Sequence, residues 1–327
     1  MKRRLIFDVL GIILSLGTIL LVIETYVRVI ADDGMQYDLE MWKYARDVKQ
    51  ISPDPLLAHE HAQSRHIVLM GVDFQTNSKG LRDREFSYDR QPGTLRILML
   101  GDSLTVGWGV PVERTFSKRI EKLFAADGVD AEVINTGVGN YNTIQEVQYF
   151  MNEGFKYRPD IVVLNFFIND AEPILPHERP SILARVCYAC IYILGRVDTL
   201  ARKYLNKKDW AEYYLSLFDG GNATGWLNAK ESIGKLAAYC RSHGIVLVIA
   251  NLPELHDVRH YRFEQISRLV QSAANQYGAG YVDILPDLKN EDSAGLWVTP
   301  EDPHPNARAH DLIAHGLHRA LKSTSVK

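Results

Sequence analysis

From Leu95 onward, short runs of aliphatic and β-branched residues alternate with longer amphipathic stretches. Strands that are apolar along their whole length are covered on both faces, as in a parallel α/β sheet. This alternation predicts strands at Arg96–Leu100, Ala131–Asn135, Ile161–Phe166, Ile245–Ala250 and Tyr281–Ile284. It predicts helices at about 113–127, 142–156, 226–242, 257–277 and 306–322. The chain is therefore expected to form a parallel α/β domain.

Two segments do not follow this alternation. Residues 32–93 are polar and contain turn signals such as Ser52-Pro53-Asp54-Pro55, which predicts an irregular leader packed on the α/β domain. The stretch at about 173–224 is long for a connection and predicts a helical insertion. Its part at 181–205 is interpreted as a plain packing element, with a lid or a membrane-facing amphipathic helix as the alternatives. The expected organisation is 1–31, 32–93 and 94–327.

The N-terminus carries a candidate membrane span. Met1-Lys2-Arg3-Arg4 precedes an apolar run from Leu5 to Ile23, in which Asp8 is the only charge. As a helix this run rises about 28 Å, close to the thickness of a bilayer core. The basic residues before it favour a cytoplasmic N-terminus and an exported remainder. We expect an uncleaved single-pass anchor in the inner (cytoplasmic) membrane, with the rest on the periplasmic or extracellular side. A cleaved signal peptide is the alternative.

Composition excludes several classes of protein. With 46% apolar residues the chain can build a core, and its net charge of -3 does not indicate nucleic-acid binding. Three cysteines form no disulfide framework, and Cys187 and Cys190 are interpreted as reduced residues on an apolar helix face, with oxidation as the alternative. His256 and His260 have helical spacing but no third ligand, so they predict a solvated helix face. We expect no metal and no cofactor.

Chemistry-bearing residues follow several predicted strands. Ligands bind beyond the carboxyl ends of the strands in such sheets, and a serine there can project its hydroxyl into the crevice. Each candidate alone is weak, because turns commonly contain these residue types. Together they supply a nucleophile, a base, a carboxylate and oxyanion donors for acyl transfer. They are Ser103 after the first strand, Asn140 after the second, Asn169 after the third, and His304 beside Glu301 and Asp302 before the last helix.

In their order along the chain, these segments resemble the blocks of the SGNH/GDSL hydrolase superfamily, most closely its bacterial membrane-anchored members. The matching segments are Gly101-Asp102-Ser103-Leu104, Asn135 to Asn140, Phe167-Ile168-Asn169-Asp170 and Asp302 to His304. The resemblance covers roughly 77–322, since Asn77-Ser78-Lys79-Gly80-Leu81-Arg82 is similar to the family's lead-in. It implies a flavodoxin-like, three-layer α/β/α fold with a parallel central sheet.

The chain departs from the family pattern at three positions. Asn140 replaces the oxyanion glycine, but the donor there is a backbone N–H and asparagine tolerates a left-handed conformation. Phe167 replaces a glycine and is expected to narrow the acyl pocket. The family carboxylate usually lies three residues before the histidine, where this chain has Glu301. Some relatives, including the alginate acetyltransferase group, use Asp-x-His instead, so we favour Asp302 and keep Glu301 as the rival.

The resemblance implies that Ser103 is the nucleophile, His304 the base and Asp302 the residue that orients it, with oxyanion donors from Ser103, Asn140 and Asn169. We expect a membrane-tethered serine esterase that removes O-acyl groups, such as O-acetyl, from an envelope or secreted glycan. Three alternatives remain open: an O-acyltransferase using the same site, a lysophospholipase or thioesterase acting on a lipid, and a non-catalytic envelope scaffold. Protein partners are not predicted.

Overall fold

The computed structural model describes residues 2–174, 181–204, 209–220 and 223–325. Its centre is a five-stranded sheet in the order β6-β5-β7-β8-β9, in which every neighbouring pair is parallel. This strand order is that of a flavodoxin-like, doubly wound sheet, and it confirms the predicted fold. The strands are β5 (Leu95–Leu100), β6 (Ala131–Asn135), β7 (Ile161–Phe166), β8 (Val246–Asn251) and β9 (Gly280–Asp283).

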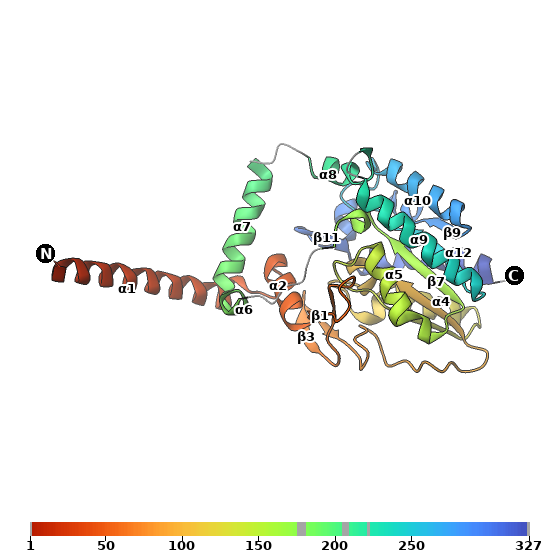
Figure 1. The fold of residues 1–327 in the computed structure, drawn as a ribbon, viewed down its shortest axis with the longest axis horizontal. Helices are drawn as coiled ribbons and strands as arrows, with labels where there is room; N and C mark the ends of the chain where they lie inside the picture. Colours follow the sequence, from red (N-terminus) through yellow and green to blue (C-terminus); the bar gives the residue numbers. More distant parts are fainter. Residues whose placement is uncertain (1, 175–180, 205–208, 221–222, 326–327) are drawn as a thin grey trace.

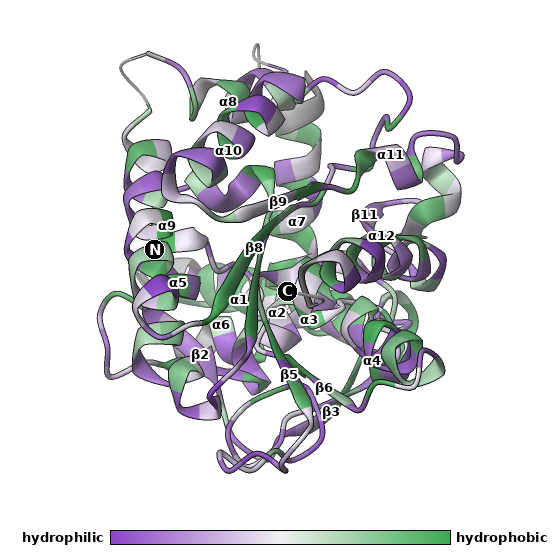
Figure 2. Ribbon diagram, turned by 90° about the vertical axis from the view of Figure 1, so that its right-hand side faces the viewer, coloured by the Kyte–Doolittle hydropathy of each residue, from purple (hydrophilic) through white to green (hydrophobic). Residues whose placement is uncertain are grey.

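Helices cover both faces of the sheet (Figure 1). Alternate residues of β5 point to opposite layers: Ile97 and Met99 belong to the apolar cluster that includes α4 and α12, whereas Leu98 and Leu100 belong to the cluster that includes α5, α9 and α10. The strands are the most uniformly hydrophobic elements and the helices are two-sided (Figure 2). The helices of these layers are α4 (Phe116–Ala126), α5 (Thr143–Asn152), α9 (Thr224–Ser242), α10 (Glu264–Tyr277), α11 (Leu285–Leu288) and α12 (Ala307–Ser325).

The expected strands agree with the structure to within one residue at each end. The expected helix at 257–277 is wrong over its first turns, because α10 begins only at Glu264. Before it, the Asp257 side chain accepts hydrogen bonds from the backbone N–H groups of Arg259 and His260. Such local bonds satisfy the backbone in a turn and compete with helix formation. His256 and His260 therefore lie in a turn and not on a helix face.

The leader is more regular than expected. It contains α2 (Tyr37–Asp47) and two antiparallel pairs, β1 (Lys49–Ile51) with β2 (His59–His61) and β3 (His66–Leu69) with β4 (Val72–Gln75). Tyr44 and Phe74 of the leader pack with Val106 and Trp108 of the α/β domain in one buried cluster. The few apolar side chains of this polar segment are thus buried against the domain, and this packing orders it.

The segment at 173–224 contains α6 (Ile182–Val186), α7 (Tyr188–Tyr204) and α8 (Trp210–Ser216). Our interpretation of Cys187 and Cys190 as reduced residues is wrong, because the two form a disulfide. Cys187 directly precedes α7, and the two Cα atoms are only 5.3 Å apart, which is within the range that a disulfide bridges. Cys240 is free and buried.

The N-terminal helix α1 (Lys2–Tyr26) continues as the π-helical turn η1 (Val27–Ala31) and projects away from the rest of the molecule (Figure 1). The stretch Ile6–Ala31 contains an 18-residue window with a mean hydropathy of 2.6 and is long and apolar enough to cross a membrane. Short elements complete the fold: α3 (Ser103–Val106), η2 (Val112–Arg114), η3 (Gly154–Tyr157), η4 (Ile168–Ala171), η6 (Ser293–Leu296), β10 (Trp297–Thr299) and β11 (Asp302–Pro305).

Candidate active site

Ser103 is placed by the turn that joins β5 to the short helix α3. The side chain of Asp102 caps this helix by accepting a hydrogen bond from the N–H of Leu104 at 2.9 Å. The turn is tight at Gly101, where an added Cβ would lie 1.9 Å from Oγ1 of Thr105. Ser103 is therefore the first helical residue beyond a buried strand, at the carboxyl edge of the sheet, where a doubly wound fold binds its ligands.

The structure brings Ser103, His304 and Asp302 together. Nε2 of His304 lies 2.9 Å from Oγ of Ser103, and Nδ1 of His304 lies 2.5 Å from Oδ1 of Asp302. Ser103 and His304 are 201 positions apart in the chain, so this contact exists only because β11 and α3 lie side by side. This is the arrangement of side chains that a nucleophile–base–carboxylate relay requires.

Asp302 is fully buried and is held on both of its oxygens. Oδ1 also accepts the backbone N–H of His304 at 3.1 Å, and Oδ2 accepts the indole N–H of Trp108 at 2.9 Å. Burial works against ionisation, but the bonds from His304 and Trp108 outweigh it and hold the pKa of Asp302 below its usual value. The site therefore keeps an ionised carboxylate behind the imidazole.

Glu301, the rival carboxylate, lies elsewhere. Its side chain is 67% exposed, and its Oε2 lies 3.7 Å from a guanidinium nitrogen of Arg196 on α7. Because Asp302 has the contact with His304, the geometry favours Asp302 over Glu301 for the carboxylate position.

Three groups are candidates for binding an oxyanion: the backbone N–H groups of Ser103 and Asn140, and the side-chain amide of Asn169. Asn140 has a φ of 66°, the left-handed conformation that glycine usually supplies. Within the described part of the chain, no hydrogen bond uses the backbone N–H of Ser103 or of Asn140. Nδ2 of Asn169 donates one hydrogen to Asp102 at 3.0 Å, which leaves the second hydrogen of that amide for a ligand. The arrangement can therefore bind a developing negative charge.

The leader braces the loop that carries Asn140. The hydroxyl of Tyr44 accepts the N–H of Gly139 at 2.8 Å. Nζ of Lys49 donates to the carbonyl oxygen of Gly139 at 2.7 Å and to Oδ1 of Asn140 at 2.8 Å. Burial lowers the pKa of Lys49 to about 7. These contacts fix the loop in the conformation that aims the N–H of Asn140.

Arg82, the last residue of the lead-in segment, braces the nucleophile from the other side. Its guanidinium donates to the carbonyl oxygens of Val106 at 3.0 Å, Gly107 at 2.5 Å and Val110 at 2.7 Å. These carbonyls lie at the end of α3 and in the loop beyond it, where helix carbonyls lack partners of their own. The side chain of Arg82 is buried. The leader therefore contributes a buried side chain that supports the loop behind Ser103.

Two further acidic residues act as braces. Burial raises the pKa of Asp102 against the opposing bonds from Leu104 and Asn169, and it raises the pKa of Asp170 well above its usual value. Asp170 accepts the N–H of Phe167 at 2.8 Å. Phe167 itself packs between the two core clusters of the sheet, and it is absent from the described lining of the pocket beside the oxyanion donors. The narrowing of an acyl pocket by Phe167 stays a prediction.

A pocket of about 360 Å³ opens beside the oxyanion donors. Most of the residues that line it have polar side chains, Lys49 among them, and they come from both the leader and the α/β domain. The residues that line it are Ala45, Lys49, His59, Asn140, Tyr141, Asn142, Gln145, Asn169, Glu172 and Pro173. Over the ranges that the structure describes, no group of three or more metal-ligating side chains is arranged around a common point.

Residues 99–312 match the family described as GDSL-like Lipase/Acylhydrolase. The chain belongs to this family. Ser103, Asn169 and His304 all lie within the matched residues, whereas α1 and the whole leader lie outside them. No curated protein matches the chain.

Several solved structures are similar to this chain at low identity. A lipase/acylhydrolase from Enterococcus faecalis is 15% identical with a TM-score of 0.46, and covers 70% of this chain and 96% of its own. A variant of an acetyl-xylooligosaccharide esterase from Geobacillus Stearmophilus is 14% identical with a TM-score of 0.47, covering 69% and 94%. The esterase EstA from Pseudoalteromonas is 14% identical with a TM-score of 0.45, covering 71% and 99%.

Sequence reasoning did not assign roles to the residues that hold the site in place. Trp108 lies five positions after Ser103, and its bond to Asp302 spans 194 positions. Lys49 and Tyr44 lie in a segment that was expected to be irregular. The lead-in that ends at Arg82 was the one signal in the sequence that pointed to a contribution from the leader.

Proposed function

We propose that this chain is a membrane-tethered serine ester hydrolase that removes a short O-acyl group, such as O-acetyl, from an envelope or secreted glycan. One observation carries the proposal: the relay from Ser103 through His304 to Asp302, with distances of 2.9 and 2.5 Å. A serine hydroxyl is a weak nucleophile unless a base accepts its proton, and this contact places the base where it is needed.

In the proposed reaction, Oγ of Ser103 attacks the ester carbonyl carbon while Nε2 of His304 takes the hydroxyl proton. Asp302 keeps the imidazole in the required tautomer and stabilises the imidazolium. The tetrahedral oxyanion accepts hydrogen bonds from the N–H groups of Ser103 and Asn140 and from the amide of Asn169, each worth roughly 3 kcal/mol of transition-state stabilisation. His304 then protonates the leaving alkoxide, and water, activated by the same histidine, releases the acyl group.

The pocket beside the oxyanion donors supports a polar substrate. Its volume of about 360 Å³ and its lining of amides, a lysine, a histidine and a glutamate suit a sugar or a short acyl group. Most of the residues that line this pocket are polar, whereas a pocket that holds a long fatty chain is expected to be lined mainly by hydrophobic side chains. We therefore favour a glycan ester over a lysophospholipid or a long-chain thioester.

Two features support a location outside the cytoplasm. The basic residues Lys2, Arg3 and Arg4 precede the apolar stretch of α1, which favours a cytoplasmic N-terminus and an exported domain. The disulfide between Cys187 and Cys190 is of a kind that persists in oxidising compartments such as the periplasm. The proposed location is the cytoplasmic membrane, with a single span and the catalytic domain on the periplasmic or extracellular side.

The test is hydrolysis of p-nitrophenyl acetate, butyrate and decanoate by the purified full chain in detergent, beside Ser103→Ala and the matched control Ser242→Ala, which alters an exposed serine on α9. We expect turnover that is highest on acetate, is unchanged in the control and falls by roughly 10³-fold or more in Ser103→Ala. Equal hydrolysis by Ser103→Ala would contradict the serine mechanism. No turnover by the folded wild-type chain would favour an acyltransferase that needs its own donor, or a scaffold.

A further inference from the structure

We propose that α7 lies in the surface of the membrane that α1 spans, with its apolar stripe in the lipid. The stripe consists of Ile193, Leu194, Val197 and Leu200. This inference rests on the membrane span in the proposed function, and it adds a second, interfacial contact with the bilayer.

The stripe has no partner in the part of the chain that the structure describes. Its four side chains are 43%, 64%, 54% and 55% exposed. Ile193, Val197 and Leu200 recur at the i, i+4 and i+7 spacing of one helix face, and Leu194 lies beside them. Large apolar side chains gathered on one face indicate a surface that is covered in the working protein.

The opposite face of α7 is the one that packs against protein. Tyr188, Ile191 and Tyr192 pack against the buried cluster of Val27, Leu39 and Ala189. Further along, Gly195 lies so close to Asp38 of α2 that an added Cβ would approach its carboxylate to 2.2 Å. The inward face therefore looks toward α2, and the stripe looks the other way.

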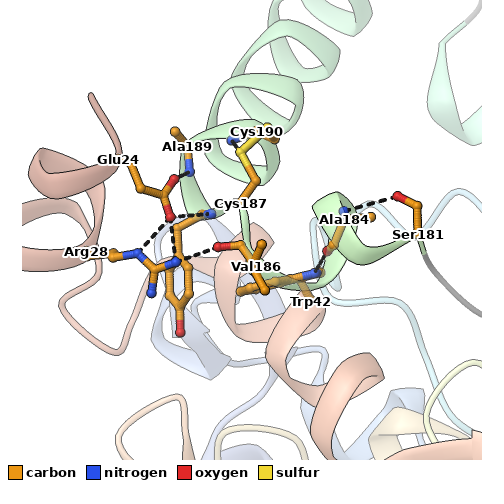
Figure 3. Close-up of a disulfide and its surroundings, with 10 residues drawn as sticks. Glu24, Arg28, Trp42, Ser181, Ala184, Val186, Cys187, Ala189 and Cys190 are labelled. Atoms are coloured by element: carbon orange, nitrogen blue, oxygen red, sulfur yellow. Dashed lines mark hydrogen bonds and ion pairs between the residues drawn. A yellow bond between two sulfur atoms is a disulfide. The ribbon is translucent and has the colours of Figure 1, made fainter. Parts of the chain in front are cut away.

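A polar clamp fixes α7 relative to α1 (Figure 3). The carboxylate of Glu24 on α1 accepts the N–H groups of Tyr188 and Ala189 at 3.1 and 2.8 Å, at the positive end of the α7 dipole. Arg28 donates to Glu24 at 2.7 Å and to the carbonyl oxygen of Val186 at 2.5 Å. The disulfide closes the same turn, where Cys187 precedes α7. These hydrogen bonds join the end of α1 to the start of α7, so they hold α7 in a fixed direction relative to α1.

That direction suits a membrane surface. In Figure 1, α7 runs across the direction of α1, starts where α1 ends, and lies between the catalytic domain and the side to which α1 projects. A bilayer around α1 would therefore meet the face of α7 that is turned away from α2, which is the face with the stripe.

The side chains at the joint also suit the headgroup layer. The guanidinium of Arg28 lies 4.1 Å from the ring centre of Tyr188, and that of Arg46 lies 4.2 Å from the ring of Trp42. Tryptophan and tyrosine are enriched at membrane interfaces, and arginine can extend its charge toward the headgroups. The exposed apolar surface of α1 extends up to this layer. The lipid that surrounds α1 is therefore the partner that would also cover the stripe on α7.

The experiment is spin-label accessibility in the full chain, reconstituted in vesicles of phosphatidylethanolamine and phosphatidylglycerol. Labels are attached at Leu194→Cys and Val197→Cys, at Leu14→Cys as the lipid reference, and at Leu227→Cys, an exposed leucine of α9, as the water reference. All four positions are exposed, so the fold should tolerate them. The native cysteines are either disulfide-bonded or buried, so the label reports the new position.

We expect the ratio of oxygen to nickel-chelate accessibility at 194 and 197 to resemble that at 14 and to exceed that at 227 several-fold. If 14 is in lipid but 194 and 197 match 227, the interfacial helix is overturned while the span stands. If 14 also matches 227, the membrane span fails, and this inference fails with that part of the proposed function. Dipolar broadening at 194 that grows with the protein-to-lipid ratio would show a second copy covering the stripe, which also overturns the inference.

Discussion

The indole nitrogen of Trp108 lies 2.9 Å from Oδ2 of Asp302, and both residues are buried. This bond joins the loop behind the nucleophile to the carboxylate behind the base. The two ends of the relay from Ser103 to Asp302 are thus connected through the core as well as through His304.

Replacing Trp108 by phenylalanine should remove this bond and leave a buried carboxylate oxygen without a donor. The loss of such a donor costs about 1–3 kcal/mol, so kcat/KM should fall by roughly 10- to 100-fold. Because the bond from Trp108 helps to lower the pKa of Asp302, that pKa should rise. When kcat/KM of the variant is measured across the pH range, its fall at acid pH should begin at a higher pH than in the wild type. An unchanged pH profile would mean that Trp108 contributes packing but no hydrogen bond of consequence to Asp302.

Asp302→Asn should abolish most of the activity, because an amide at this position favours the wrong imidazole tautomer. In serine proteases the corresponding change costs roughly 10⁴-fold in kcat. Glu301→Gln is the matched control: its side chain is exposed and pairs with Arg196 rather than His304, so kcat should stay within about twofold of the wild-type value. Steady-state kinetics on p-nitrophenyl acetate distinguish the two carboxylates, and the reverse ranking would assign the role to Glu301.

Lys49→Met should loosen the loop that carries Asn140. Two hydrogen bonds from Nζ are lost, and the oxyanion donor is no longer held in its left-handed conformation. We expect kcat to fall about 10-fold with little change in KM, since the oxyanion forms only in the transition state. The neighbouring change Gln50→Met, on an exposed side chain bonded to Glu60, should leave both constants unchanged. A rise in KM with constant kcat would instead place Lys49 in ground-state binding.

His310 should make the fold sensitive to acid. Burial lowers its pKa to about 3, and its Nδ1 accepts the N–H of Phe116 at 3.0 Å, so the folded chain holds it neutral. The unfolded chain takes up a proton below about pH 6.5, so stability is lost as the pH falls from there toward 3. His310→Asn keeps an acceptor near Nδ1 and should flatten this part of the stability curve, although a cavity lowers stability at neutral pH.

Thermal unfolding measured between pH 4 and 8 tests whether stability falls with falling pH and whether His310→Asn reduces that fall. The control His315→Asn changes an exposed histidine on the same helix and should keep the wild-type slope. An unchanged slope in His310→Asn would mean that other groups account for the acid sensitivity, with His61 as the next candidate because burial lowers its pKa to about 3 as well.

The sheet could be predicted because each strand carries its own signal. A run such as Ile161–Phe166 is buried at every position. A short apolar run between amphipathic stretches is typical of a strand covered on both faces. The helix at 257–277 was overextended because the Asp257 turn depends on side-chain bonds that periodicity does not record. The site segments could be found because strand ends in a parallel sheet meet at one edge.

The supports of the site could not be predicted in the same way. Lys49 and Trp108 act on groups about 90 and 194 positions away, and nothing in their neighbours along the chain indicates those partners. The disulfide depends on where α7 begins: Cys187 lies just outside the helix, and helical spacing alone suggests a shared face rather than a bond.

The connection from Ala31, where η1 ends, to Tyr37, where α2 begins, can reach no more than roughly 20 Å even when fully extended. The ring of Tyr37 lies 6.2 Å from that of His304. With α1 in a bilayer, so short a tether would confine catalysis to a thin layer above the lipid. Turnover would then follow the number of ester groups per unit of membrane area rather than their concentration in the bulk, and polymer strands would be processed as they pass that layer.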